Sequence, residues 1–298
     1  MPETHRFEEM LPAEIEAEMR AHPVCYVPSG TLEWHSYHLP VGLDSLKAHA
    51  LCEDVAARAG GIVVPPTYWA IGGMPYPWTT KMEAPVVEAL FAGIYRQLAE
   101  VGFRVIVVLA GHYSLEHYLT LKRVAVEIMR DRDVTILPLA EFEVVAETGF
   151  HGDHAARWET SLLWSVRPDL VHLDRLPEGP PEGVLGEDPR LNASREAGDR
   201  MRALIADRIA AMTRRLEEAT SPDERRAYIE ALATQVQVME AVAAERRVKP
   251  KWEVTLLMTD EYIAYLECLR NGDYVAAAEH VRAKLATLPY ASYTDSHG

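Results

Sequence analysis

Cysteine is scarce in this 298-residue chain, and the three that occur, Cys25, Cys52 and Cys268, show no C-x-x-C spacing. Neither a disulfide framework nor a thiolate metal site is therefore predicted. Long apolar runs are also missing, since no stretch approaches the roughly 18 residues of a membrane-spanning helix. The N-terminus lacks the apolar core of a signal peptide. We therefore expect a cytoplasmic protein with no membrane partner.

Basic residues are in the minority, because 30 lysines and arginines stand against 45 aspartates and glutamates and give a formal net charge of -15. This balance argues against a surface that follows a phosphate backbone and suits a soluble enzyme. We expect no nucleic-acid partner. The length allows one large α/β domain or two smaller ones, with a substantial core.

Strand and helix signals alternate along the first half of the chain. Short apolar, β-prone runs predict strands over 24–27, 62–64, 105–109 and 134–138. Helical patterns lie around 11–19, 45–59, 84–101 and 115–130, and the third has apolar residues at Val86, Leu90, Ile94 and Leu98. The order indicates βαβ units. The uninterrupted apolar run 105–109 predicts a parallel strand that is buried on both faces.

The most informative stretch, residues 28–44, places Glu33, His35 and Asp44 within twelve positions. It follows the first strand, at the sheet edge where open α/β proteins bind their ligands. Glu33 and His35 are two residues apart, so in an extended segment they leave the same face and can reach one metal or two adjacent metals. Asp44 begins a helical run, and a plain N-cap role fits that position equally well.

His112 follows the apolar strand 105–109 and is predicted to lie at the same edge. A histidine after a strand is often only a hydrogen-bonded structural residue, but Gly111 before it allows close backbone approach and favours a functional role. The irregular, aromatic stretch 65–81 contains Trp78 and indicates a pocket wall or lid. Its alternative is a loop that its own aromatic side chains fold onto the core.

A third segment, 151–166, leads into an apolar helix. If that helix starts near His154, Glu159 lies about 140° around it, so the two side chains can flank one site at the helix start. Asp153 has an alternative role as the N-cap, and Glu159 as a solvated carboxylate.

Taken together, the loops supply a mixed set of oxygen and imidazole donors: Glu33, His35, Asp44, His112 and Glu159. Such a set suits Zn, Mn or Fe(II) and suits Cu(I) or iron–sulfur clusters poorly. Asp153 and His154 are left as an oriented acid/base pair.

At this point the chain resembles the creatininase (creatinine amidohydrolase) family over about residues 20–215. The shared motifs are Gly30-x-x-Glu33-x-His35-x-x-His38-Leu39-Pro40-x-Gly42-x-Asp44, Gly111-His112, His154-Ala155 with Glu159-Thr160-Ser161, and Gly186-Glu187-Asp188-Pro189 with Ser194-Arg195-Glu196-Ala197-Gly198. The resemblance implies a three-layer α/β/α fold with a mainly parallel sheet, commonly assembled as a ring-like hexamer. It also implies one or two divalent metals (Zn, Mn or Fe) on the five donors above, with Asp44 as the bridging ligand and His154 as the proton shuttle.

The activity that the resemblance implies is hydrolysis of a C–N amide bond in a small molecule by metal-activated water. Cyclic amides, formamides and small terminal peptide-like amides are the candidate substrates. Two alternatives stay open, a metal-dependent sugar or keto-acid lyase or isomerase on the same scaffold and a non-catalytic ligand-binding member.

Two departures from the family pattern bear on the metal site and on the substrate. Tyr113 matches the creatinine-hydrolysing members, but Ser114 stands where those members place a metal-binding glutamate. Phe150 and His151 precede the catalytic pair where those members carry a substrate-gripping tryptophan, so creatinine is not the first substrate we expect. Substrate contacts are predicted for Tyr113, Ser114 and Trp78.

The chain beyond about residue 221 exceeds the family core. We predict a catalytic domain over 1–220 and a helical extension over 221–298 that packs on the domain or on a neighbouring subunit. Its helices are expected over 222–246 and 260–285, with the stretch 252–258 between them.

Overall fold

A four-stranded, all-parallel sheet in the order β2-β1-β3-β4 forms the centre of the protein. The computed structural model describes residues 5–219, 221–248 and 259–287. The strands are β1 (Val24–Ser29), β2 (Ile62–Val63), β3 (Val105–Ala110) and β4 (Thr135–Ala140). All four predicted strands are confirmed, with ends that differ by one or two residues.

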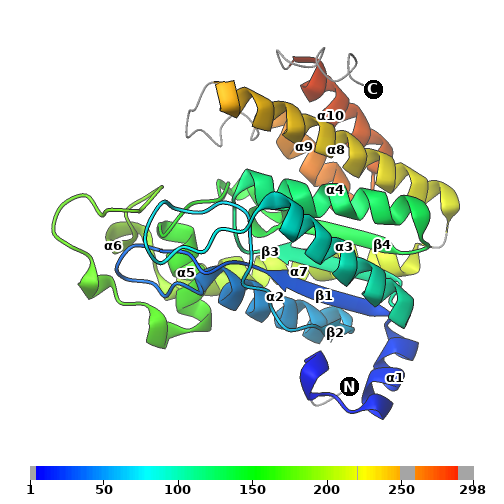
Figure 1. The fold of residues 1–298 in the computed structure, drawn as a ribbon, viewed down its shortest axis with the longest axis horizontal. Helices are drawn as coiled ribbons and strands as arrows, with labels where there is room; N and C mark the ends of the chain where they lie inside the picture. Colours follow the sequence, from blue (N-terminus) through cyan, green and yellow to red (C-terminus); the bar gives the residue numbers. More distant parts are fainter. Residues whose placement is uncertain (1–4, 220, 249–258, 288–298) are drawn as a thin grey trace.

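Helices cover both faces of the sheet (Figure 1). One face carries α2 (Leu43–Ala59) and α7 (Arg195–Glu218), and the other carries α3 (Ala84–Val101) and α4 (Leu115–Asp131). The three-layer α/β/α prediction is confirmed. Smaller helices complete this part: α1 (Pro12–Ala21) beside β2, α5 (Arg157–Val166) on α7, and the single turn α6 (Pro189–Asn192).

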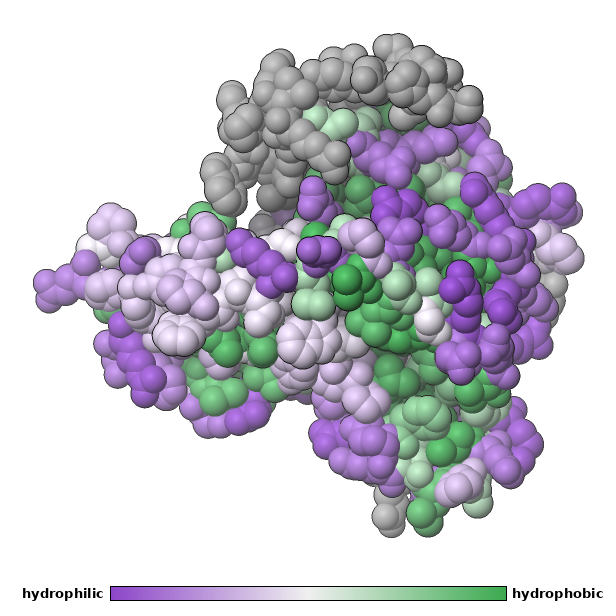
Figure 2. Space-filling view, viewed as in Figure 1, coloured by the Kyte–Doolittle hydropathy of each residue, from purple (hydrophilic) through white to green (hydrophobic). Residues whose placement is uncertain are grey.

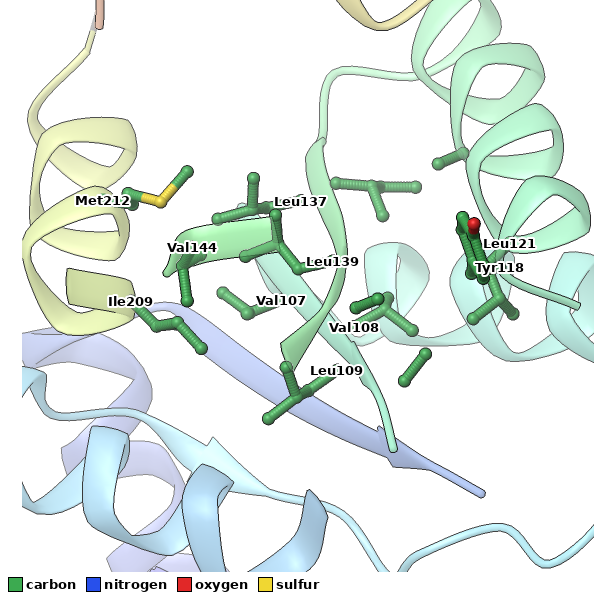
Figure 3. Packing of buried hydrophobic residues seen from close by; sticks show 14 of the residues in the cluster. Val107, Val108, Leu109, Tyr118, Leu121, Leu137, Leu139, Val144, Ile209 and Met212 are labelled. Atoms are coloured by element: carbon green, nitrogen blue, oxygen red, sulfur yellow. The ribbon is translucent and has the colours of Figure 1, made fainter. Parts of the chain in front are cut away.

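Strand β3 is buried on both faces, as its unbroken apolar run predicts. Figure 3 shows Val107 and Leu109 on the side of Ile209 from α7, and Val108 on the opposite side with Tyr118 from α4. Alternate residues of a strand point to opposite faces, so this strand contributes to two layers of core at once. Each such buried aliphatic side chain stabilises the fold by about 1.5–3 kcal/mol.

Helix α3 has the predicted bounds, but its buried stripe lies elsewhere than the sequence pattern suggests. Val86 and Leu90 are 47% and 37% exposed. The buried side chains are those of Val87, Phe91, Tyr95 and Leu98. Phe91 and Tyr95 are fully buried, and large aromatic side chains dominate core packing, so they decide which face turns inward. Figure 2 shows the resulting hydrophobic area on the surface over α3.

The C-terminal helices form a further layer on the outside of α4 (Figure 1). Helix α8 (Pro222–Val248) packs along α4, and α10 (Tyr274–Thr287) packs on α8 and on α9 (Asp260–Asn271). The helical stretch predicted over 260–285 is present but is divided into two helices, because Gly272 adopts a left-handed φ of 81° and caps α9. The stretch 252–258 lies outside the described residues. None of the described helices combines the length and apolarity that crossing a bilayer requires.

Three strands end level with one another. Ser29 at the end of β1 pairs with Ala110 at the end of β3, which in turn pairs with Ala140 at the end of β4. The segments that leave these ends are the loop 30–42, the turn 111–114 and the 3-10 helix η2 (Glu141–Val144). They share one edge of the sheet, so their side chains converge there.

Candidate metal centre

The five donors expected from the sequence come together at this edge and are buried. Three groups of three have ligand atoms within 4.8 Å of one another, and one of them joins His154 to Glu33 and His35. The first centre, as we name it, consists of Glu33, Asp44 and His112, and the second centre consists of His35, Asp44 and Glu159. Asp44 belongs to both centres, which is the arrangement that a bridging carboxylate requires.

Asp44 reaches the sheet edge because two glycines let helix α2 approach the strand ends. The helix begins one residue before Asp44 with Gly42 as its N-cap, so the alternative that Asp44 is itself the N-cap is wrong. A Cβ on Gly30 would lie 2.4 Å from the Ser45 nitrogen, and one on Gly111 would lie 2.2 Å from the Asp44 carbonyl oxygen. Any side chain at either glycine would push the start of α2 away from the site.

The imidazole of His112 is oriented by the aromatic loop. Its Nε2 donates to the carbonyl oxygen of Ile71 at 3.2 Å, and a carbonyl only accepts. Its Nδ1 therefore faces the first centre, 2.9 Å from Glu33 Oε2 and 3.1 Å from Asp44 Oδ2. The same loop donates the Met74 backbone N–H to Glu33 Oε1 at 2.6 Å. The stretch predicted as a pocket wall thus holds two of the candidate ligands in place.

The imidazole of His35 is held in a similar way and leaves unpaired atoms. Its Nδ1 donates to the Glu33 carbonyl at 3.0 Å, so Nε2 faces the second centre, 3.1 Å from Asp44 Oδ1 and 3.5 Å from Glu159 Oε2. Apart from this contact with one another, His35 Nε2 and Asp44 Oδ1 are buried without a hydrogen-bond partner. Two such atoms facing one another fit a shared divalent ion, so this donor set passes the test for a metal.

The pKa values of the cluster also indicate that a positive charge is missing. Burial disfavours the imidazolium forms, but Asp44 and Glu159 outweigh it and raise the pKa of His35 to about 9. In the same way, Glu33 and Asp44 overcome burial and raise the pKa of His112 to about 10. Burial raises the pKa of Glu159 to about 8 in spite of His35 nearby. Protons on the two imidazoles therefore stand in for the positive charge that a metal would bring.

The predicted pairing of Asp153 with His154 is not formed. The Asp153 carboxylate instead accepts the backbone N–H groups of Trp158 at 2.7 Å and Glu159 at 3.1 Å. The reason is that α5 begins at Arg157 and not near His154, so Asp153 is placed to cap its first turn. The N-cap of α5 is Ala156, so Asp153 is not itself the N-cap, but its carboxylate accepts the backbone N–H groups that an N-cap side chain would accept.

His154 is oriented by a backbone group. Its Nε2 donates to the carbonyl oxygen of Trp34 at 2.9 Å. Its Nδ1 faces the cluster, 3.8 Å from Glu33 Oε1 and 4.0 Å from Glu159 Oε2. Burial and the neighbouring His35 lower the pKa of His154 to about 4, which leaves a neutral ring with its lone pair directed at the site.

Unusual backbone conformations follow both of these imidazoles. Ser36 and Ala155 have φ values of 57° and 51°, and they are the non-glycine residues with positive φ in the described part of the chain. Such a conformation costs about 1–3 kcal/mol and concentrates at functional sites. Here it turns His35 and His154 toward one another, with ring centroids 4.4 Å apart. The Ala155 N–H also donates to Glu159 Oε2 at 2.8 Å and fixes that carboxylate.

The residues predicted to contact substrate differ in how exposed they are. Tyr113 is half-buried and donates its hydroxyl to Glu141 Oε2 at 2.5 Å. Ser114 is half-buried at the start of α4, whereas Trp78 is 67% exposed. Their contacts with substrate remain predictions.

Sequence reasoning missed Lys47 and Glu141, which are buried next to the second centre. Lys47 Nζ lies 2.7 Å from Glu141 Oε2 and 3.7 Å from Glu159 Oε1. The sequence position of each residue does indicate that it lies near the site. Lys47 is three positions after Asp44 and therefore on the same side of α2, and Glu141 directly follows β4 at the edge that carries His112.

The fold and the site define an α/β protein with two carboxylate–imidazole centres that share one aspartate. A family model described as creatinine amidohydrolase matches residues 8–213. The creatinine amidohydrolase of Pseudomonas putida is 30% identical over 181 residues, which cover 53% of this chain and 70% of that relative. The chain belongs to the creatininase family.

Solved structures agree with this assignment. A crystal structure of creatinine amidohydrolase (creatininase) superimposes with a TM-score of 0.64 at 25% identity and covers 70% of this chain and 96% of its own. A structure described as creatininase Mn gives a TM-score of 0.61 at 27% identity and covers 72% of this chain and 98% of its own. The resemblance drawn from the motifs is confirmed.

Proposed function

We propose that this protein is a metal-dependent amidohydrolase that cleaves a C–N amide bond in a small molecule. The substrate is a cyclic amide, a formamide or a small terminal peptide-like amide. The single observation that carries the proposal is the position of Asp44, whose Oδ2 faces His112 while its Oδ1 faces His35. The family relation to creatinine amidohydrolases supports it.

The residues that would hold the metal are those of the two centres, with Asp44 common to both. Mixed carboxylate and imidazole donors match Zn, Mn or Fe, and the solved creatininase with Mn in its description supports this range. When bound, a divalent ion supplies a water of lowered pKa and polarises the amide carbonyl.

His154 is the proton carrier in this proposal. Its neutral Nδ1 takes a proton from the attacking water and then delivers it to the leaving nitrogen, which otherwise departs poorly. The Trp34 carbonyl holds the ring in this tautomer through the hydrogen bond to Nε2. Asp153 acts indirectly, because its carboxylate fixes the first turn of α5 and thereby the position of Glu159.

Creatinine is not the first substrate we propose. Phe150, at the position where the creatinine-hydrolysing members resembled here carry a tryptophan, is fully buried and packs against Phe142 and Trp158. Its ring is therefore part of the core and is not presented to a ligand.

The proposed assembly is a homo-oligomer, a hexamer by family resemblance. The proposed division of the chain is a catalytic domain over 1–220 and a helical extension over 221–298. The end of the family match at residue 213 supports this boundary.

The test is a panel of small amides incubated with protein loaded with Zn²⁺ or Mn²⁺, with His154→Ala as the matched control. Release of a free amine together with a carboxylate by the wild type, and a loss of about 10²–10⁴-fold in the variant, is the expected result. Products that lack the elements of water would indicate a lyase or isomerase. Tight binding of amides without turnover would indicate a ligand-binding protein. Either outcome would overturn the proposal.

A further inference from the structure

Lys47 is a fixed positive charge inside the site. It lies on α2, and its side chain is fully buried. Its ammonium group donates to the Gly111 carbonyl, the Tyr113 hydroxyl and Glu141 Oε2, each at 2.7 Å. An ammonium has three N–H donors, and here each has an acceptor. The group is therefore held both in its charged form and in one position.

Glu159 lies between this cation and the second centre. Its Oε1 is 3.7 Å from Lys47 Nζ, whereas its Oε2 is 3.5 Å from His35 Nε2. Any ion bound by His35, Asp44 and Glu159 would share the Glu159 carboxylate with Lys47. It would also lie close to the ammonium in a buried environment, where like charges repel strongly.

The first centre has no such neighbour. Glu33 and Asp44 form ion pairs only with histidines, and within the described ranges no lysine or arginine nitrogen lies within 4 Å of either carboxylate. The first centre also contains two carboxylates that are not shared with a fixed cation. The two centres therefore have the same kinds of ligand, two carboxylates and one imidazole, but only the second has a lysine ammonium within 4 Å of one of its carboxylates.

We propose that Lys47 makes the two centres unequal, so that a divalent ion fills the first centre tightly and the second centre only weakly. The inference rests on the proposed function in assuming that the five donors bind metal. It adds that this chain works with one firmly held ion, and that Lys47 supplies a permanent charge beside the place of the other.

The experiment is a Mn²⁺ titration of the full-length protein after chelator treatment, with free Mn²⁺ measured by electron paramagnetic resonance. Wild-type protein should bind one ion tightly and a second at least about 10²-fold more weakly. The double variant Lys47→Met/Glu141→Gln removes the cation together with its partner carboxylate and keeps the net charge. It should tighten the weak site by about 10–100-fold.

The single variant Glu141→Gln distinguishes an electrostatic role of Lys47 from a purely structural one. This variant keeps the ammonium but removes its main counter-charge, so the weak site should become weaker still. If Lys47 and Glu141 had a purely structural role, the Mn²⁺ affinity of the weak site would change in the same direction in both variants. The proposal requires that it change in opposite directions. The tight site should be unchanged in both variants, and it reports that each variant is folded.

The outcomes are distinguishable. Two equally tight ions in the wild type, or a weak site that responds equally in both variants, would overturn the role of Lys47 and leave the proposed function intact. No bound Mn²⁺ in the wild type would overturn the proposed function and this inference with it. If the double variant no longer binds the tight ion, the single variant Glu141→Gln decides between the outcomes. A weak site of unchanged or higher affinity in that variant contradicts the proposal.

Discussion

Two carboxylates of the short helix η2, Glu141 and Glu143, each bind a buried lysine, but the clusters around them differ in how completely their polar atoms are paired. Glu141 pairs with Lys47 at 2.7 Å beside the metal centres, and Glu143 pairs with Lys122 at 2.9 Å on the side of the C-terminal helices. The two carboxylates are only two residues apart. The comparison distinguishes a cluster that stabilises the fold from one whose composition suits a bound ligand.

The Glu143 cluster is fully satisfied. Its Oε2 accepts from Lys122 and from the Ala140 N–H, and its Oε1 accepts from Gln235 of α8 and from Tyr262 of α9. No side-chain atom of this described set is left without a partner. The cluster therefore ties α8 and α9 to the end of β4 and needs nothing further.

The cluster at the candidate metal centres is incompletely paired. Apart from the ion pair between the first two, His35 Nε2, Asp44 Oδ1 and Glu141 Oε1 are buried without hydrogen bonds. Three carboxylates face three imidazoles there, and the ring of His154 is neutral. Incomplete pairing together with an excess of negative charge indicates a cation that the protein itself does not supply. Burial of charged residues alone would not have distinguished the two clusters.

The largest expected effect comes from Asp44→Ala, which should remove metal from both centres because only a shared carboxylate serves two ions. Glu33→Ala is the matched control and should spare the second centre. Metal per chain, measured by elemental analysis after dialysis, is the readout. Equal, mild losses in both variants would mean that Asp44 is not a bridge.

His154→Ala should lower turnover by about 10²–10⁴-fold while metal content stays near that of the wild type. The reason is that His154 Nδ1 lies 3.8 Å and 4.0 Å from the Glu33 and Glu159 carboxylates, farther than the nitrogens of His35 and His112 lie from theirs, although it also forms a group with Glu33 and His35. Asp153→Ala provides the contrast, since it should cost about 0.5–2 kcal/mol of stability through the lost cap. Loss of metal in His154→Ala would make this residue a ligand.

Glu143→Gln should destabilise the fold by about 3–5 kcal/mol, because it leaves the Lys122 ammonium buried without a counter-charge. Metal binding by the folded protein should be unchanged. The readout is urea unfolding, and Glu230→Gln, which removes a surface partner of Arg282, is the control that should cost less than about 1 kcal/mol. A loss of metal affinity without a loss of stability would reverse the roles assigned to the two clusters.

The last prediction concerns pH and the metal-free protein. The pKa values of His35 and His112 rise on folding from 6.5 to about 9 and about 10, since nearby carboxylates outweigh the opposing effect of burial. A raised pKa means that the folded state holds these protons more tightly. The resulting stabilisation is complete below about pH 6.5 and is lost as the pH rises through 9 to 10.

Thermal unfolding of chelator-treated protein should therefore shift to lower temperature between pH 6.5 and 10. Protein loaded with metal should not share this loss, since its ligands bind the ion in their deprotonated forms. A metal-free protein that gains stability over the same interval would contradict the charge assignment.

Much of the fold followed from local sequence patterns. The strand 105–109 and the helix 84–101 were predictable because an unbroken apolar run and a helical repeat each fit one structure. The buried stripe of α3 was not, because Phe91 and Tyr95 decide it through tertiary packing. The break at Gly272 required its left-handed conformation to be recognised as a helix end.

The candidate site was likewise only partly predictable from the sequence. The five donors were recognisable because they end strands or begin helices at one sheet edge. The acid/base pair failed because residues adjacent in sequence need not face one another, and Asp153 turned to the backbone of α5. Lys47 remained hidden because a lysine in a helix is ordinarily solvated, and its burial depends on Glu141 almost a hundred residues later.

The most direct test of the account is the anomalous scattering of zinc in crystals of the wild-type protein. The account predicts a peak enclosed by Glu33, Asp44 and His112, with the Nδ1 of His112 and the carboxylate oxygens at about 2.0–2.2 Å. A weaker peak beside His35 and Glu159 would report the second centre. At saturating zinc, a map without any peak within ligand distance of Asp44 would contradict the assignment of this cluster as a metal centre.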